Sequence, residues 1–128
     1  MTPRGLWNIS YVLYREDRIK SLQTALPTFK IKPNDSWCDN QTKRSYNKPL
    51  GYIVEGSDEN LYRNDSLYDI IFVINQNKCP VIPGLGSAIF LHVSEKNRDF
   101  TAGCIAVSNQ NIKKILRRCS AKTKIQIL

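Results

Sequence analysis

Residues 67–74 constrain the fold of this chain more than any other stretch. They read Leu-Tyr-Asp-Ile-Ile-Phe-Val-Ile, a nearly continuous apolar run rich in β-branched and aromatic side chains. Such side chains favour strands, and an apolar run without polar alternation is typical of a strand covered on both faces. We therefore expect a central strand whose sheet carries a packed layer on each side.

Other runs also have the pattern of strands. Residues 6–14 alternate in polarity, which predicts a half-buried strand with Trp7, Ile9, Tyr11 and Leu13 on one face and Asn8, Ser10 and Val12 on the other. Short apolar runs predict further strands at residues 50–55, 87–94 and 104–107, and alternation predicts an edge strand at residues 124–128. The predicted fold is mainly β.

One helix is expected after residue 107. Ser108 suits the N-cap because its hydroxyl can accept a hydrogen bond from an N–H of the first turn. Apolar side chains then recur at helical spacing, at Ile112, Ile115, Leu116 and Cys119. This spacing predicts an amphipathic helix with Cys119 in the core and a basic, solvent-facing side.

The connecting segments are predicted from their composition. Residues 19–33 are sparse in apolar side chains and interrupted by prolines, so we expect an extended loop with one short strand. Residues 34–48 are strongly polar and predict a long surface loop anchored by Trp37; a role in lining a substrate groove stays open. Residues 59–67 predict one or two helical turns, and residues 79–86 an irregular connector.

Length and charge narrow the class of protein. The 128 residues predict a single domain, and the 41% hydrophobic content is ordinary for a globular chain. The net charge of +8 favours an anionic partner without naming it. Its one local concentration comprises Lys113, Lys114, Arg117, Arg118, Lys122 and Lys124. Without interleaved aromatics to stack bases, nucleic acid is not expected as a partner.

The sequence shows no membrane or export signal. No run is long and apolar enough to predict a transmembrane segment, and no signal peptide is recognisable.

The four cysteines do not suggest a metal site. Cys38, Cys79, Cys104 and Cys119 are widely spaced without a C-x-x-C pair, and His92 is the single histidine. A structural zinc site is therefore not expected. Disulfides stay open, because four cysteines permit three complete pairings.

His92 and Cys104 form the candidate catalytic pair. They lie twelve positions apart, each in a strand-like run. A thiol needs a base to become a nucleophile at neutral pH, and a neutral imidazole is the usual one. Structural roles for a lone histidine and a lone cysteine are the alternative. The small residues Thr101, Ala102 and Gly103 before the cysteine favour the catalytic reading, since their N–H groups can approach an oxyanion.

A histidine at a strand end, a spacer, and a Thr-x-Gly-Cys turn followed by a strand and a helix resemble the L,D-transpeptidase catalytic domain family. Thr2-Pro3-Arg4-Gly5-Leu6-Trp7 is similar to its Thr-Pro-x-Gly-aromatic turn. Segments similar to the α-proteobacterial branch of that family are Trp37-Cys38-Asp39, Tyr46-Asn47, residues 61–69 and residues 83–92. The resemblance extends over nearly the whole chain.

This resemblance implies a mixed β-sheet sandwich or barrel with one C-terminal amphipathic helix and long loops. It implies a monomeric enzyme of the periplasm or cell envelope that crosslinks peptidoglycan stem peptides. Cys104 would be the nucleophile and His92 the base, with Gly103, Thr101 and Ser87 in the oxyanion and substrate-binding positions. By the same resemblance, the reaction would need no metal and no organic cofactor. Ala102 stands where the broader family has a second histidine, and Ile105 and Ala106 where it has an arginine.

Three further expectations follow from the same comparison. Because the chain opens at the Thr-Pro-x-Gly turn, we expect it to lack the family's signal sequence and first strand. A non-catalytic module of the same fold that binds peptidoglycan or another polyanion is the alternative function. A hydrolase that passes the acyl group to water is a second alternative within the enzymes.

Overall fold

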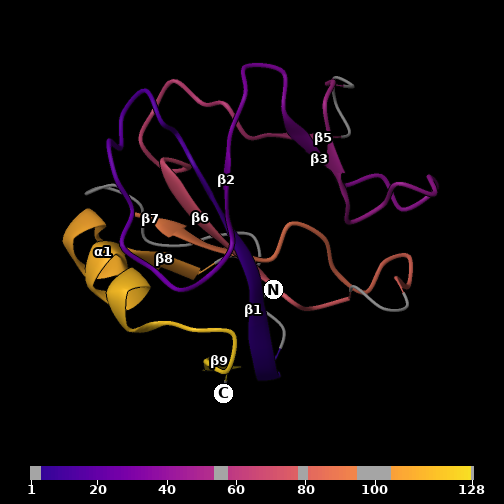
Figure 1. The fold of residues 1–128 in the computed structure, drawn as a ribbon. Coiled ribbons are helices and arrows are strands. Elements are labelled where there is room, and N and C mark those ends of the chain that lie inside the picture. The colour runs from indigo at the N-terminus through magenta and orange to yellow at the C-terminus, as the bar shows by residue number, and fades with distance from the viewer. Residues whose placement is uncertain (1–3, 54–57, 78–80, 95–104, 128) are drawn as a thin grey trace.

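The computed structural model describes residues 4–53, 58–77, 81–94 and 105–127, and Figure 1 shows their arrangement. The elements are β1 (Gly5–Tyr14), β2 (Thr28–Lys30), β3 (Ser36–Cys38), β4 (Pro49–Leu50), β5 (Asp58–Asn60), β6 (Ile70–Ile74), β7 (Phe90–Val93), β8 (Ile105–Val107), α1 (Asn109–Arg118) and β9 (Lys124–Ile127). The main sheet has the order β2-β1-β6-β7-β8, with β9 also paired to β1, and a smaller sheet has the order β4-β3-β5. A mainly β fold with a C-terminal amphipathic helix is thus confirmed.

The central strand β6 is buried on both faces, as its sequence predicts. All five of its residues are buried, and it lies between β1 and β7 with antiparallel pairing to each. Ile70, Phe72 and Ile74 belong to one apolar core, and Ile71 and Val73 to another. The strand begins three residues later than predicted, because residues 67–69 form the turn that leads into it.

Different elements cover the two faces of the main sheet. Ile112 and Leu116 of α1 belong to the core that includes Phe72, whereas Trp37 of β3 belongs to the core that includes Ile71. In Figure 1, α1 and the strands β3 and β5 accordingly lie on different sides of β6. The main sheet is therefore the middle layer, with the helix on one side and the small sheet on the other.

The predicted faces of β1 are wrong beyond Ser10. Ile9 pairs with Ile74 and Tyr11 with Val73, so two steps on β1 match one step on β6, which is a β-bulge. The extra residue exchanges the two faces. Val12 therefore joins the core of Ile9, whereas Tyr11 and Leu13 contact the other core.

The predicted helix and its N-cap residue Ser108 are confirmed in α1. Ser108 Oγ accepts a hydrogen bond from Asn111 N at 3.2 Å, and Ile112 and Leu116 are buried. Cys119 is the C-cap residue and is 5% exposed, within the core under the helix. In the part of the chain that the structure describes, no helix is long and apolar enough to span a membrane.

Several connecting segments differ from prediction. Residues 59–67 form the end of β5 followed by bends, not helical turns, because Asp65 uses its carboxylate to bond Leu67 N and Arg63 locally. The strand expected at residues 50–55 ends at Leu50, and Tyr52 and Ile53 are exposed; residues 54 and 55 lie outside the described residues. Within residues 34–48, Trp37 is fully buried as expected, but it lies on strand β3. The short strand within residues 19–33 is confirmed as β2, and the edge strand as β9.

Candidate active site

His92 lies within the main sheet on β7. Its Cα pairs with Ile71 of β6 and with Ala106 of β8, and the residue is only 3% exposed. Side chains alternate along a strand, so His92 shares its face with Phe90, which packs among Trp37 and Tyr68. The sequence therefore predicted correctly that this histidine is carried by a buried strand.

The imidazole of His92 is held by its own strand. Its Nδ1 lies 2.8 Å from the carbonyl oxygen of Val93. A carbonyl oxygen only accepts hydrogen bonds, so Nδ1 is the protonated nitrogen in this contact. In a neutral imidazole the lone pair then lies on Nε2, which is the tautomer that a general base with an Nε2 acceptor requires.

The aromatic ring of Tyr68 packs edge-to-face against His92. The ring centroids are 5.3 Å apart with an interplanar angle of 76°. The Tyr68 hydroxyl donates to Glu59 Oε1 at 2.6 Å, and Glu59 belongs to β5 of the small sheet. A chain of contacts therefore joins the small sheet to the histidine.

Strand β8 brings the chain that follows Cys104 next to the histidine strand. Ile105, which is covalently bonded to Cys104, pairs in parallel with Leu91, the neighbour of His92. Cys104 itself, and the predicted Gly103 and Thr101, lie outside the described residues.

Ser87 contacts the small sheet. Its Oγ donates to the carbonyl oxygen of Cys38 at 2.8 Å, at the end of β3. Asp39 follows directly, and desolvation raises the pKa of its carboxyl even though the residue is largely exposed. Ser87 thus joins the segment entering β7 to the loop after β3.

Asn47 organises this same region and was not identified from the sequence as a key residue. Its Oδ1 accepts from Trp37 Nε1 at 2.9 Å and from Ala88 N at 3.2 Å. Its Nδ2 donates to the carbonyl oxygens of Gln76 and Asn77 at 3.1 and 2.7 Å. One buried amide therefore connects three loops, including the one that leads to His92.

Backbone conformation explains why asparagine occupies this position. Asn47 has a φ of 58°, in the left-handed region that asparagine tolerates better than most residues. Ala88 also has a positive φ of 55°, which delays the start of β7 to Phe90 instead of the predicted residue 87. Among local sequence features, only the Asn in a polar loop pointed to this conformation, and such asparagines are common in loops.

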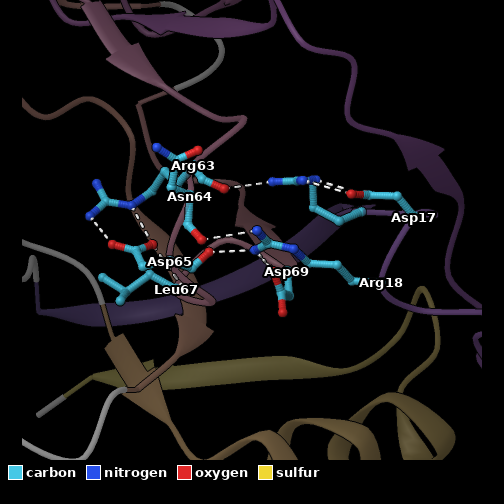
Figure 2. Close-up of polar contacts among 8 residues, drawn as sticks. Asp17, Arg18, Arg63, Asn64, Asp65, Leu67 and Asp69 are labelled. Atoms are coloured by element: carbon cyan, nitrogen blue, oxygen red, sulfur yellow. Dashed lines mark hydrogen bonds and ion pairs between the residues drawn. The ribbon is translucent and has the colours of Figure 1, made fainter.

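An arginine cluster ties the end of β1 to the segment before β6, as Figure 2 shows in part. Arg15 is buried and pairs with Asp17 through two hydrogen bonds of 2.8 and 2.7 Å. Its Nη1 donates to the carbonyl oxygen of Arg63 at 2.6 Å, and its Cζ lies 3.5 Å from the ring centroid of Tyr62. Arg18 donates to the carbonyl oxygens of Asn64 and Asp65 and to the Asp69 carboxylate.

We expect Arg15→Met to lower the free energy of unfolding by about 2 kcal/mol, because the partly buried carbonyl of Arg63 loses its donor and Tyr62 loses its stacked cation. Urea denaturation of the purified chain measures this change. Lys30→Met, which removes the exposed Lys30–Glu16 ion pair, is the control and should leave the midpoint unchanged. Equal midpoints for Arg15→Met and wild type would contradict the prediction.

The structure describes two of the four cysteines. Cys38 and Cys119 are buried and free. Burial raises the pKa of the Cys119 thiol, an effect opposed by a hydrogen bond with Thr123, and a raised pKa disfavours the nucleophilic thiolate. Residues 4–53, 58–77, 81–94 and 105–127 contain no group of three side chains that could hold a metal ion.

In a comparison with known protein families, residues 1–127 match the L,D-transpeptidase catalytic domain (YkuD). Comparisons with curated proteins and with solved structures gave no significant match. Since the family match covers essentially the whole sequence, the chain belongs to the L,D-transpeptidase catalytic domain family.

Proposed function

We propose that this chain is a cysteine-dependent L,D-transpeptidase that acts on peptidoglycan stem peptides, with Cys104 as nucleophile and His92 as base. The observation that carries the proposal is the pairing of β8 with β7. Ile105, bonded to Cys104, pairs with Leu91, the residue before the buried histidine. The cell envelope is the location that fits a peptidoglycan substrate, and the prediction of a monomer is retained.

The proposed reaction begins with formation of the thiolate. His92 Nε2 takes the proton of the Cys104 thiol, and the sulfur attacks the carbonyl carbon before the terminal D-amino acid of the donor stem. The N–H groups of Gly103 and Cys104 stabilise the resulting oxyanion, and Thr101 and Ser87 contact the substrate. The imidazolium then protonates the leaving nitrogen as the C–N bond breaks, which leaves a thioester on Cys104.

The second half transfers the acyl group. The side-chain amine of an acceptor stem attacks the thioester carbonyl and gives its proton to His92. The C–S bond breaks, the thiol is restored, and a new amide crosslinks the two stems. His92 thus accepts and returns one proton in each half-reaction, for which the Nδ1–H···O contact to Val93 is a suitable support.

A tetrapeptide stem is the direct test. We expect an intact-mass increase equal to the stem minus its terminal amino acid, and a crosslinked dimer after addition of an acceptor amine. Free tripeptide without dimer would indicate the hydrolase, because water then replaces the amine. Absence of both adduct and products under these conditions would contradict the proposal.

A second candidate function is a non-catalytic module that binds an anionic polymer. It is favoured by the exposed basic side chains of α1, which are Lys113, Lys114, Arg117 and Arg118. If the chain has this function, it binds an anionic wall polymer with an affinity that falls steeply as the salt concentration rises. Its intact mass stays unchanged, because no covalent bond forms. The stem experiment therefore separates the two functions.

A further inference from the structure

The His92 ring makes contacts of two kinds, a hydrogen bond and aromatic packing. The hydrogen bond from Nδ1 to Val93 O fixes one edge of the imidazole. A hydrogen bond at one edge restrains tilt of the ring less than packing against its face or edge does. The ring of Tyr68, at 5.3 Å and nearly perpendicular, packs against the imidazole and limits this tilt.

Tyr68 is itself held firmly enough to act as a support. The residue is 5% exposed, and its ring packs edge-to-face on Phe90 with centroids 5.9 Å apart. Arg63 Cζ lies 5.4 Å from the centroid of the same ring. The hydroxyl is bonded to the Glu59 carboxylate at 2.6 Å, the short distance typical of a charged acceptor.

Glu59 connects this support to a separate part of the fold. It lies on β5, where its Cα pairs with Trp37 of β3. Trp37 in turn packs edge-to-face on Phe90, with centroids 5.1 Å apart, and Phe90 is two residues before His92. The small sheet and the histidine strand are therefore joined both by packing and by the Glu59–Tyr68 hydrogen bond.

We propose that Tyr68 is a positioning residue for His92, and that Glu59 keeps Tyr68 in the supporting orientation. The inference rests on the proposed function, since the orientation of His92 affects a reaction rate only if His92 is the base. Tyr68 acts through the imidazole and takes part in no bond-making step. It keeps Nε2 in the orientation that proton transfer from the nucleophile requires, because a small displacement of the base slows this transfer.

The kinetic test measures acylation by a carbapenem, a β-lactam whose strained amide forms an adduct with a reactive thiol. We expect Tyr68→Leu to lower the acylation rate constant at saturation by at least about tenfold, with the half-saturating concentration nearly unchanged. Tyr68→Phe keeps the ring and should recover the rate to within about two- to fourfold of wild type. Tyr62→Leu removes a ring of the same segment that lies against Arg15, and it should retain the wild-type rate in its folded fraction.

The role of Glu59 is tested by a double-mutant cycle. Glu59→Ala and Tyr68→Phe remove the same hydrogen bond, so we expect similar losses of about two- to fourfold and little further loss in the double variant. Additive losses would contradict the proposed role of Glu59. Should Tyr68→Leu not fold, this cycle decides the proposal, because both of its single substitutions retain the buried ring.

A spectroscopic test does not depend on activity. His92 is the only histidine, so its imidazole signals in long-range ¹H–¹⁵N spectra need no assignment. We expect the protonated-Nδ1 tautomer in the wild-type chain and a mixture of tautomers in Tyr68→Leu. Unchanged spectra and rates in folded Tyr68→Leu would overturn the positioning role. A wild-type chain that forms no adduct but shows the Tyr68-dependent spectrum would instead contradict the proposed function.

Discussion

Cys104→Ala is expected to abolish the covalent adduct with a carbapenem or a stem tetrapeptide. The thioester has no other proposed attachment site, and a methyl group cannot replace the sulfur. We expect no adduct peak in the intact mass spectrum of this variant under conditions in which the wild-type chain is fully modified. The far-ultraviolet circular dichroism of both proteins should agree, which shows that the loss is chemical.

Cys119→Ala is the matched control for this result. Cys119 is 5% exposed under α1, and burial raises the pKa of its thiol, so it should contribute no nucleophile. The folded variant is expected to form the adduct at the wild-type rate. Equal adduct in Cys104→Ala and wild type, or loss of adduct in folded Cys119→Ala, would contradict the assignment of Cys104.

Asn47→Ala is expected to have the largest effect on stability, lowering the free energy of unfolding by about 4 kcal/mol. The substitution removes four hydrogen bonds made by an amide that is 2% exposed. It also places alanine at a φ of 58°, where its Cβ is strained. Urea denaturation measures the change, and we expect the acylation rate of the folded fraction to fall as well, since Asn47 holds the segment before β7.

Further substitutions at residue 47 separate the loss of the amide hydrogen bonds from the strain at positive φ. Asn47→Gly accepts the positive φ but lacks the amide, so it should recover about 1 kcal/mol of the loss. Asn47→Asp keeps the shape but turns a carboxylate oxygen toward the carbonyl oxygens of Gln76 and Asn77, and it should be as destabilising as alanine. Asn40→Ala, which removes only local bonds to Thr42, is the control and should cost under about 1 kcal/mol. An Asn47→Ala loss no larger than this control would contradict the role of Asn47.

Local patterns in the sequence predicted those helices and strands in which every side chain on a given face has the same burial. The apolar run of β6 and the spacing of Ile112 and Leu116 in α1 depend on burial of whole faces, so periodicity identifies them. The bulge at Ser10 has no comparable signature, because inserting one residue alters the pairing with β6 while each residue keeps its local preference. The bends around Asp65 likewise differ from the predicted helical turns, because carboxylate bonds to nearby N–H groups compete with helix formation.

For the candidate site, the sequence by itself determined which chemical groups are available, namely one imidazole on a strand-like apolar run and a cysteine preceded by the small residues Thr101, Ala102 and Gly103. The resemblance of its motifs to those of L,D-transpeptidases indicated the family, and the family match over residues 1–127 confirms that membership. Only the tertiary structure decided what surrounds the imidazole. Tyr68 lies 24 positions before His92 and Glu59 another nine before Tyr68. These contacts exist because β5, β6 and β7 are brought together by sheet pairing and core packing, which no local periodicity encodes.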